Sequence, residues 1–445
     1  MKNGQPYQPY QPASVWSVDG TEPVTIPSGN TAPTTLLPME ADVAIVGGGY
    51  TGLGAAYTLA QHGQRVVLCE GRTFGWGASS RNAGMLLTGL SRTYSDIAAQ
   101  YGSAVARKLF RASLKAVDHA VSLIEREGIA CHLHHSGHIV LANRAHHMAD
   151  LSREATLLQR ECSHPVRLLS QTQLAAEIGA SCFAGGLLDE ASYSVHAAKF
   201  VAGLVQATLR AGAVLFEHTP VERIARLRHG FLLSTPRGDV LAQAVIVATN
   251  GYTGHLTPSL RRRLVPVGSY SIATEILPDH LAQSISPRNR LFYDTRHIGA
   301  YFRLTPDNRL LYGGRDITRP DQDGAIAARA HSLHHELLQV FPQLHGVRIA
   351  YAWGGNVCLA FDGLFHAGPL DGIAGLYYAA GYAGHGGALA SYTGRVLAER
   401  ILGIAEDDDL LALPPLPAAP IPYDGDPWFV PLVGSAWKLL DQVGR

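Results

Sequence analysis

Residues 41–70 read ADVAIVGGGYTGLGAAYTLAQHGQRVVLCE and predict a strand, a helix and a second strand. Residues 41–47 are a short apolar run rich in β-branched side chains, which favours a buried strand. Residues 50–63 follow a helical pattern that ends in a glycine, and residues 64–70 form another apolar run. Two strands joined by a helix in this way lie parallel in one sheet, with a right-handed crossover.

The turn between the first strand and the helix carries the pattern G-x-G-x-x-G. The first glycine permits the tight turn, the second lets the backbone approach a pyrophosphate, and the third lets helix and strand pack closely. The helix N-terminus adds free N–H groups that attract phosphates. Glu70 ends the second strand, where its carboxylate can accept hydrogen bonds from both hydroxyls of a ribose. The unit therefore predicts a dinucleotide site that disfavours NADP, whose 2′-phosphate this carboxylate would repel.

Helical and strand-like stretches continue outward from this unit. We expect helical segments between residues 95 and 128, and strands at 136–143 and 241–250. Residues 261–316 alternate strand-like runs with turns, which predicts a mainly antiparallel sheet. Residues 375–403 repeat the order of strand, glycine-rich loop and helix. The pattern predicts an α/β chain, α+β overall, with a Rossmann-like domain and a second domain built on the antiparallel sheet.

The composition excludes several classes of protein. The 445 residues contain 36 Lys and Arg against 36 Asp and Glu, and this zero net charge argues against a nucleic-acid binder, which needs a basic surface. The five cysteines form no C-x-x-C pair, which disfavours a disulfide scaffold and a cysteine-rich zinc module. With 47% hydrophobic residues the chain can bury a large core, and its length suggests two or three domains or one large discontinuous domain.

The two ends of the chain differ from its body. The first 38 residues are polar and lack the basic start and apolar run of a signal peptide, so we expect an extended arm on a cytoplasmic protein. No apolar stretch of the sequence reaches the roughly 20 residues that span a bilayer. The final residues, PLVGSAWKLLDQVGR, are amphipathic and could dock on a membrane surface, on a partner or on the body of the protein, and we expect the last.

Seven segments between about residues 38 and 405 carry a family resemblance. They are ADVAIVGGGYTGLGAAYTLA, GWGASSRNAG, VIVATNGYTG, PVGSYSIATE, YFRLTPDNRLLYGGR, YAWGGNVCLAFDG and LYYAAGYAGHGGALASYTGRVLAERI. The sequence resembles the D-amino acid oxidase/glycine oxidase superfamily of FAD-dependent amine oxidoreductases. More narrowly, it is similar to the gamma-glutamylputrescine oxidoreductase-like branch, which is related to monomeric sarcosine oxidase and to the small subunit of D-amino acid dehydrogenase.

The resemblance implies a Rossmann-like FAD-binding domain and a substrate domain whose sheet covers the flavin, each assembled from separate stretches of the chain. The expected stretches are an extended N-terminal arm (1–37), three parts of the FAD-binding domain (38–90, 151–262 and 349–405), two parts of the substrate domain (91–150 and 263–348) and a C-terminal tail (406–445).

The resemblance also implies, position by position, which residues hold a noncovalently bound FAD. The glycine turn and Glu70 would hold the ADP part, and the small residues after the second strand would line the pyrophosphate and the flavin. The C-terminal glycine loop would present a helix N-terminus to the pyrimidine end of the flavin, which is anionic when reduced. The implied residues are Gly47, Gly49, Tyr50, Thr51, Gly52, Glu70, Gly71, Arg72, Gly77, Ala78, Ser79, Ser80, Arg81, Asn82, Ala83, Gly84, Met85, Val221, Thr249, Asn250, Gly251, Tyr382, Gly384, His385, Gly386 and Gly387.

The reaction implied by the resemblance is hydride removal from the carbon beside an amine nitrogen, which gives reduced FAD and an imine that water hydrolyses. Because the cofactor performs the redox step, the protein has to orient the C–H bond and favour the neutral amine, and it requires no strong general base. The implied substrate is a primary or secondary amine or an amino acid, and oxygen or a quinone-type acceptor would reoxidise the flavin. The sequence leaves the substrate, the acceptor and the oligomeric state open.

Five residues are candidates for contact with the substrate. Tyr270 lies where strand alternation could aim it at the flavin, and Tyr301 and Arg303 share one strand face by period two. A buried Arg303 could clamp a substrate carboxylate with two hydrogen bonds. Trp353 could wall an apolar cavity, and His385 could tune the reduced flavin by titrating near neutral pH. The alternatives are an ordinary strand tyrosine, a surface arginine and a core tryptophan.

Cys358 and two histidine clusters suggest further chemistry that we do not expect. Sarcosine oxidases of the superfamily attach FAD through a cysteine in the region of Cys358, but the spacing to the next aspartate is shorter here, so we expect a noncovalent FAD. The stretch CHLHHSGH (131–138) and the helically spaced His331, His334 and His335 could begin a metal site. Neither cluster supplies a full ligand set, and we predict no metal.

Three other functions stay open at this point. They are a flavin-dependent 2-hydroxyacid dehydrogenase of the same fold, a non-catalytic FAD-binding subunit of a dehydrogenase complex, and an FAD hydroxylase that uses NAD(P)H. An assay that distinguishes imine from keto products separates the first from an amine oxidoreductase. Rapid bleaching of the yellow protein by an amine would exclude the second, and NAD(P)H oxidation without substrate would favour the third.

Overall fold

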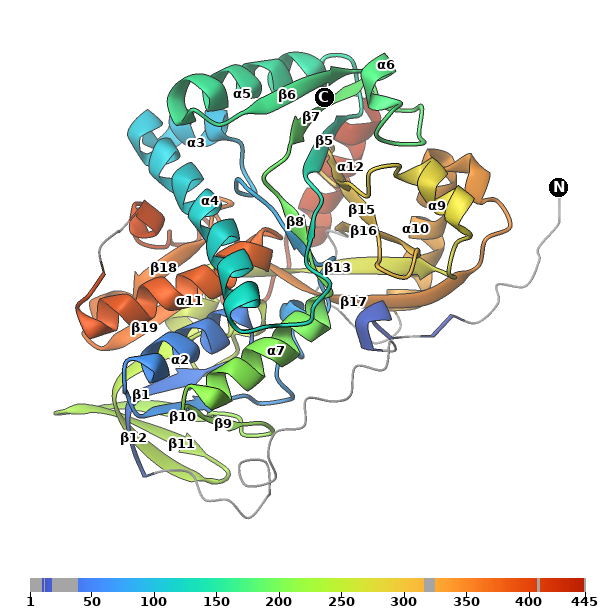
Figure 1. Cartoon of the computed structure of the whole chain (residues 1–445). Helices are drawn as coiled ribbons and strands as arrows, with labels where there is room; N and C mark the ends of the chain where they lie inside the picture. Colours follow the sequence, from blue (N-terminus) through green and yellow to red (C-terminus); the bar gives the residue numbers. More distant parts are fainter. Residues whose placement is uncertain (1–9, 12, 18–38, 316–324, 406–408, 444–445) are drawn as a thin grey trace.

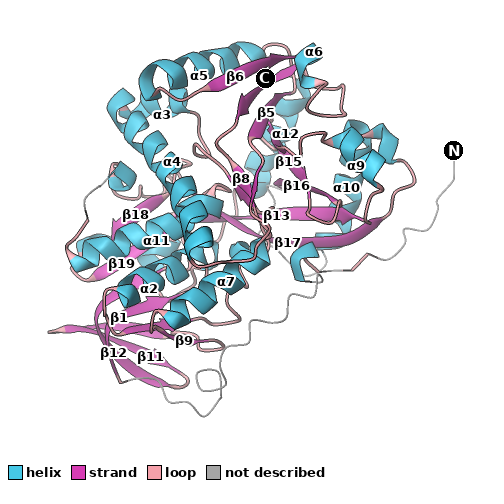
Figure 2. Cartoon of the chain, viewed as in Figure 1, coloured by secondary structure: helices cyan, strands magenta, loops and turns pink. Residues whose placement is uncertain are grey.

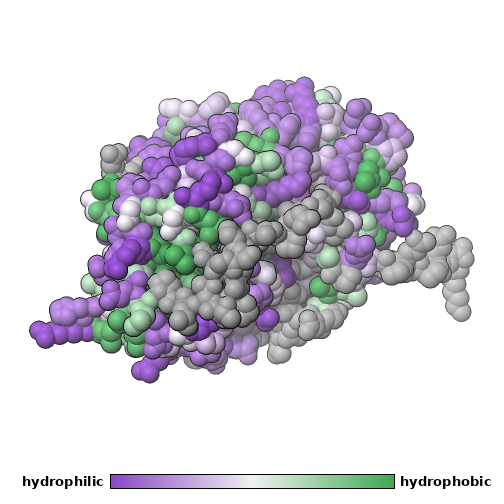
Figure 3. Space-filling view, turned by 60° about the horizontal axis from the view of Figure 1, so that its bottom comes forward, coloured by the Kyte–Doolittle hydropathy of each residue, from purple (hydrophilic) through white to green (hydrophobic). Residues whose placement is uncertain are grey.

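Two eight-stranded sheets with helices around them form the framework of the chain (Figure 1, Figure 2). The computed structural model describes residues 10–11, 13–17, 39–315, 325–405 and 409–443. Most of the expected N-terminal arm, 1–37, therefore lies outside the described residues. The described surface seen in Figure 3 is largely hydrophilic, with separate apolar patches between the polar side chains.

The strand–helix–strand unit forms as predicted, with β1 (Glu40–Val46), α2 (Tyr50–Gln61) and β2 (Val66–Cys69). β1 lies parallel to β2 on one side and parallel to β12 (Gly238–Val247) on the other. β9 and β19 extend this parallel part, and the antiparallel β10, β11 and β18 complete the sheet. The bounds of these strands are β9 (Val214–Phe216), β10 (Arg223–Leu227), β11 (Gly230–Thr235), β18 (His366–Pro369) and β19 (Leu376–Ala380).

The topology of this first sheet decides where its loops meet. Because β1, β2, β12 and β19 are parallel, the chain segments that follow them all emerge at the same edge of the sheet. These segments contain the glycine turn at 47–49, Glu70, residues 248–255 and the glycine loop at 381–387. Four motifs that are distant in the sequence are thereby placed side by side.

Helices α2, α7 (Ala197–Arg210) and α11 (Gly386–Leu402) cover one face of the first sheet, and α4 (Ser103–Arg126) lies over α11 (Figure 1). α2 and α11 approach closely, since a Cβ at Gly394 would collide with the backbone carbonyl of Thr51. The helical region expected at 95–128 forms two helices, α3 (Tyr94–Tyr101) and α4, because Gly102 adopts a φ of +86° between them.

The second sheet has the strand order β17-β13-β16-β15-β14-β5-β7-β6. All neighbouring strands are antiparallel except β14 and β5, which confirms the mainly antiparallel second sheet. The bounds are β5 (His138–Ala142), β6 (Val166–Ser170), β7 (Gly185–Asp189), β13 (Leu264–Thr274), β14 (Leu291–Asp294), β15 (Ala300–Leu304), β16 (Leu310–Arg315) and β17 (Ile349–Ala360). A small third sheet joins β3 (Met85–Leu86), β8 (Tyr193–Ser194) and β4 (His134–His135).

Sheet membership differs from the expected domain stretches at two places. β6 and β7 lie within 151–262 and β17 lies within 349–405, yet all three strands belong to the second sheet. Strand pairing brings them there over long sequence separations, which composition and periodicity do not reveal. The domain limits themselves stay a prediction.

The remaining helices and 3-10 turns complete the described structure. They are α5 (His147–Cys162), which the sequence reading missed, α6 (Gln171–Leu174), α8 (Pro258–Arg261), α9 (Asp279–Ile285), α10 (Ala325–Val340), α12 (Val430–Val443) and the 3-10 turns η1 (Val15–Ser17), η2 (Ala78–Ser80), η3 (Asn250–Tyr252), η4 (Pro342–Leu344), η5 (Leu370–Gly372) and η6 (Asp409–Leu411). Within the described ranges, no helix combines the length and apolar character that a membrane crossing needs.

Candidate active site

A cavity of about 910 Å³ runs from the glycine turn after β1 to the second sheet. One end is lined by the segments that emerge from the parallel strands of the first sheet. The other end is lined by side chains of β13, β14, β15 and β17. The cavity thus connects the predicted dinucleotide site with the antiparallel sheet predicted to cover the flavin.

The glycine turn presents backbone rather than side chains to this cavity. Gly47 has a φ of +108°, and a Cβ there would lie 2.7 Å from the carbonyl oxygen of Ala248. A Cβ at Gly52 would collide with the carbonyl oxygen of Gly47, so this glycine lets α2 pack directly against the turn. The first turn of α2 faces the same cavity, and its Tyr50 N–H donates to Ser79 Oγ at 3.0 Å. A pyrophosphate can therefore approach the positive end of the helix closely.

Glu70 lies at the nucleotide end of the cavity. Its Oε2 accepts a hydrogen bond from the Gly48 N–H at 2.7 Å, and its Oε1 accepts one from the Arg72 N–H at 2.8 Å. These two bonds hold the carboxylate beside the glycine turn. Val221, the expected adenine contact, lines the same end and is almost completely buried.

The loop after β2 is braced by its own asparagine. Asn82 Nδ2 donates to the carbonyl oxygens of Ala78 at 3.0 Å and Ser79 at 2.8 Å, and its Oδ1 accepts from the Gly84 N–H at 2.7 Å. The bonds close residues 78–84 into a compact turn whose outer side lines the cavity. Arg81 lies in this turn and donates from Nη1 to the Gly354 carbonyl at 3.0 Å.

The C-terminal glycine loop closes the middle of the cavity. His385 is the N-cap residue of α11, so the first N–H groups of this helix face the cavity. Tyr382 Oη and Thr51 Oγ1 are 2.8 Å apart, which ties this loop to α2. Asn250 Oδ1 accepts from the Gly381 N–H at 3.0 Å, which ties the loop to the segment after β12. The three predicted nucleotide-binding segments thus form one connected surface.

All of the implied cofactor residues line the cavity except Gly52, Ser80, Gly84 and Gly251. Ser80 is turned inward, because its Oγ donates to the Gly75 carbonyl at 2.7 Å. Gly84 lies directly against the carbonyl of Val195, and Gly251 packs against side chains of β17. A backbone-lined turn, two helix N-termini and the half-buried carboxylate of Glu70 at one end make this cavity fit an extended dinucleotide such as FAD.

Hydroxyl groups of the second sheet line the opposite end. Tyr301 Oη lies 3.0 Å from Ser271 Oγ and 3.3 Å from Ser269 Oγ. The two serines come from β13 and the tyrosine from β15, and all three line the cavity. Tyr301 and His385 are the two candidate substrate-contacting residues that line the cavity, one at each side of it.

The other three candidates do not line the cavity. Tyr270 lies between the two cavity-lining serines of β13, so strand alternation points it to the opposite face, where it packs with the core of the second sheet. The sequence reading assigned the phase of this strand the wrong way round. Trp353 packs in the core and donates from Nε1 to the Arg81 carbonyl at 2.8 Å.

Arg303 is buried and bonded to backbone carbonyls. Its Nη1 donates to Gly84 O at 2.7 Å and to Val195 O at 3.2 Å, and its Nε donates to Leu304 O at 2.9 Å. Burial lowers the pKa of this guanidinium to about 9. The side chain does share a face with Tyr301, but it braces the loop beside the cavity and is not placed to clamp a carboxylate there.

Sequence reasoning missed several residues at the sheet end of the cavity. Tyr293 lies near the end of strand β14 and Arg296 in the loop two residues after this strand. Tyr252 lies on the segment after β12, and Asn356 lies on β17. The ring of Tyr293 lies 6.1 Å from that of His385. The run YDTRH at the end of an apolar strand was the available signal, since polar and aromatic residues at a strand end are typical of a site wall.

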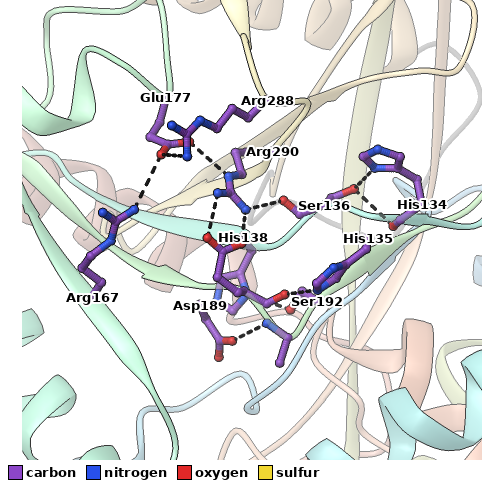
Figure 4. A network of polar contacts seen from close by, with 12 residues as sticks. His134, His135, Ser136, His138, Arg167, Glu177, Asp189, Ser192, Arg288 and Arg290 are labelled. Atoms are coloured by element: carbon purple, nitrogen blue, oxygen red, sulfur yellow. Dashed lines mark hydrogen bonds and ion pairs between the residues drawn. The ribbon is translucent and has the colours of Figure 1, made fainter.

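A polar network surrounds Arg290 and extends to His138 (Figure 4). Arg290 is buried and donates from Nε to Glu177 at 3.1 Å, from Nη2 to Glu190 at 2.8 Å and from Nη1 to the Ser136 carbonyl at 2.9 Å. His138 stacks on Tyr293, with ring centroids 5.4 Å apart. Burial lowers the pKa of His138 below its usual range, so this ring is neutral at neutral pH.

The histidines of the 131–138 cluster have protein partners. His134 Nδ1 lies 3.0 Å from Ser136 Oγ, His135 Nε2 lies 2.6 Å from the Glu190 carbonyl, and His138 Nδ1 lies 2.8 Å from Ser192 Oγ. In the part of the chain that the structure describes, no group of three or more His, Cys, Asp or Glu residues is placed to hold a metal ion. The expectation of no metal stays a prediction.

Comparison with known proteins decides the family. A model of the FAD-dependent oxidoreductase family, described as "DAO: FAD dependent oxidoreductase", matches residues 42–400. The chain belongs to this family. It is similar to the gamma-glutamylputrescine oxidoreductase of Escherichia coli (strain K12), with 34% identity over 413 residues that cover 91% of this chain and 94% of the relative. The resemblance that the sequence motifs indicated is confirmed.

Two further relatives cover most of the chain. The probable oxidoreductase OrdL of Haemophilus influenzae is 32% identical over 379 residues, which cover 84% of this chain and 85% of the relative. The crystal structure of glycine oxidase from Geobacillus kaustophilus superposes with a TM-score of 0.69 at 26% identity, covering 82% of this chain and 95% of that chain. The chain is therefore an FAD-dependent oxidoreductase, and its fold is the expected Rossmann-like FAD-binding unit with an antiparallel second sheet.

Proposed function

We propose that this enzyme oxidises a primary or secondary amine to an imine, with amino acids as the second substrate class. The observation that supports this most is the continuous cavity, which joins a backbone-built dinucleotide cradle to a wall of hydroxyl groups. The names of the relatives point the same way: gamma-glutamylputrescine and glycine, named in two of them, both contain an amine nitrogen.

The residues of the wall are suited to orient an amine. When bound, FAD supplies the chemistry, because it accepts a hydride from the carbon beside the nitrogen. Tyr301 Oη and Ser271 Oγ can accept hydrogen bonds from the N–H groups of a neutral amine and so fix the direction of the neighbouring C–H bond. The N–H groups at the start of α11 can stabilise negative charge on the pyrimidine end of a bound flavin. No strong base is required of the chain.

The arginines near the wall favour amines over α-amino acids. Arg303 donates to three backbone carbonyls. Arg296 lines the cavity, but its Nη2 lies 2.7 Å from Asp294 Oδ2 and its Nε donates to the same carboxylate at 2.9 Å. A substrate carboxylate would have to displace these partners, and the gain in charge pairing would be small.

We also propose that FAD is held without a covalent bond. Cys358 lines the cavity, but burial raises the pKa of its thiol to about 12. The thiolate that a covalent attachment requires is therefore scarce at neutral pH. Precipitation of the protein with acid should release all of the flavin into the supernatant.

The test is anaerobic mixing of the purified yellow enzyme with a panel of primary amines, secondary amines, amino acids and 2-hydroxy acids. We expect amines to bleach the flavin fastest. Hydrolysis of the imine should then give a carbonyl compound together with ammonia from a primary amine, or with a primary amine from a secondary amine. Bleaching by 2-hydroxy acids alone would overturn the proposal. Admission of air or of a quinone afterwards identifies the acceptor, while gel filtration and cell fractionation test the oligomeric state and the predicted cytoplasmic location.

A further inference from the structure

Trp16 is a buried side chain near the start of the chain that the proposed reaction does not use. It lies in η1 and is only 1% exposed. It packs in one apolar cluster with Ala83, Ala197 and Trp353. Its burial indicates that this segment is built into the fold.

The segment around Trp16 is also held by backbone pairing. The Gln11 N–H donates to the Ala350 carbonyl at 2.9 Å, and the Ala352 N–H donates to the Gln11 carbonyl at 3.1 Å. Gln11 thereby forms a parallel bridge with Tyr351 of β17. These bonds fix Gln11, five residues before the tryptophan, beside the second sheet.

The indole of Trp16 contacts the loop that lines the cavity. Its Nε1 donates to the carbonyl oxygen of Asn82 at 2.7 Å. The ring also lies 4.8 Å from the ring of His196 and 5.7 Å below the guanidinium of Arg303. The hydrogen bond is short, and it is made to the residue whose side chain braces the loop.

Two other buried donors bind the same loop. Trp353 Nε1 donates to the carbonyl of Arg81 at 2.8 Å, and Arg303 Nη1 donates to the carbonyl of Gly84 at 2.7 Å. Together with the bond to Asn82, three buried side chains from three parts of the chain fix three carbonyls within residues 81–84. These buried donors therefore fix the position of the loop whose other side lines the cavity.

We propose that Trp16 is a positioning residue for FAD, so that the N-terminal segment is a working part of the cofactor site. Trp16 holds the Asn82 carbonyl, and the loop that this carbonyl belongs to presents Ser79 and Arg81 to the cavity. The inference rests on the proposed placement of this loop against FAD. Loss of the indole N–H frees the loop to shift, which weakens the binding of the cofactor rather than the substrate.

The test is the substitution Trp16→Phe, which keeps an aromatic ring and removes the N–H donor. We expect the dissociation constant for FAD, measured by titration of the apoprotein, to rise about 5- to 10-fold, as for the loss of one buried hydrogen bond. Trp428→Phe is the matched control, since Trp428 is 52% exposed and lies outside the cavity lining, and it should leave the constant unchanged.

A second readout separates positioning from general stability. FAD raises the melting temperature of the protein by an amount that depends on its affinity. A merely structural defect in Trp16→Phe would lower the melting temperatures of apoprotein and holoprotein equally, whereas a positioning role reduces the increase that FAD produces. An unchanged dissociation constant with an unchanged increase would overturn the proposal.

The substitution Asn82→Ala distinguishes the placement of the loop 78–84 against FAD from the positioning role of Trp16. If Asn82→Ala weakens FAD binding and Trp16→Phe does not, the loop contacts FAD but the inference about Trp16 is wrong. If neither substitution weakens FAD binding, the placement of the loop against FAD fails as well, and the inference falls with it. Weaker binding in both variants supports both statements.

Discussion

The nucleotide end of the cavity is lined mainly by backbone groups, whereas the sheet end is lined mainly by side chains. At the nucleotide end, glycines and helix N-termini present backbone N–H groups, and the backbone N–H groups of Gly48 and Arg72 hold Glu70. At the sheet end, hydroxyls and rings such as those of Tyr301 and Tyr293 project from two adjacent antiparallel strands of the second sheet, β15 and β14. The first surface depends on where side chains are absent, and the second on which way they point. The two ends should therefore respond differently to substitution.

The largest effect is expected from Gly52→Ala at the nucleotide end. The added methyl group would collide with the carbonyl oxygen of Gly47, and neither backbone segment can move without opening the turn. We expect the affinity for FAD to fall by about 100-fold or more, which corresponds to about 3 kcal/mol. Titration of the apoprotein with FAD measures this loss.

Gly254→Ala is the control for this prediction, because Gly254 lines the same cavity and a Cβ there would meet nothing within 4 Å. Its affinity for FAD should stay close to that of the unchanged enzyme. Equal FAD affinities in the two variants would mean that close packing at the glycine turn is not required for FAD binding.

The second effect concerns the stability toward acid of the helices that pack on the first sheet. His119 lies on α4 beside Tyr392 of α11, and burial lowers its pKa to about 3. A lowered folded-state pKa contributes stability above the unfolded value of about 6.5, and this stability is lost as the pH falls. Between pH 7 and pH 5 the loss from this group should be about 2 kcal/mol.

Urea unfolding of the apoprotein at both pH values measures this loss. His119→Gln should reduce the difference between the two pH values by about 2 kcal/mol, whereas His229→Gln, at an exposed turn, should leave it unchanged. The account of His119 is contradicted if His119→Gln is as sensitive to acid as the unchanged protein.

The third prediction compares two tyrosines of the second sheet. Tyr301→Phe removes the hydroxyl that lies beside Ser271 in the cavity, and we expect the rate of flavin reduction by an amine to fall about 10-fold, at unchanged FAD content. Tyr270→Phe changes a side chain on the opposite face of the sheet and should leave that rate unchanged. Stopped-flow absorbance under anaerobic conditions measures both rates. A slower rate in Tyr270→Phe alone would contradict the assignment of Tyr270 to the face of β13 that points away from the cavity.

The smallest effect is expected at the outer side of the sheet end, where α12 docks on the loop after β14. Asp441 Oδ1 accepts from the His297 N–H at 2.9 Å, and its Oδ2 accepts from the Ile298 N–H at 3.0 Å. These bonds confirm that the C-terminal segment docks on the body of the protein. His297 lines the cavity, so Asp441→Asn should raise KM for the amine about 3-fold without a change in FAD affinity.

The exposed neighbour of this aspartate supplies the control, since Gln442→Ala should leave both constants unchanged. If Asp441→Asn weakens FAD binding as strongly as it raises KM, then α12 supports the whole fold and not the sheet end alone.

The two ends also differ in how far they could be predicted. The glycine turn and the unit from β1 to β2 could be predicted because their signals are local: apolar runs, a G-x-G-x-x-G pattern and an acidic residue within 30 positions. Tyr270 could not be placed, because a shift of one residue in strand phase reverses every side chain of the strand. Arg303 lies on the predicted strand face, but the backbone carbonyls that its guanidinium binds could not be predicted. The partners of Arg303, the carbonyls of Gly84 and Val195, lie more than 100 residues away in the sequence.

The central claim is that one cavity holds FAD at the glycine turn and the amine at the wall of hydroxyl groups. A crystal structure of the enzyme with FAD and a non-reactive amine tests it most directly. The account predicts the pyrophosphate at the start of α2, the flavin ring beside Gly384–Gly387, and the amine nitrogen within hydrogen-bond distance of Tyr301 or Ser271. An amine bound against Tyr270 or Trp353, or a flavin ring outside this cavity, would contradict it.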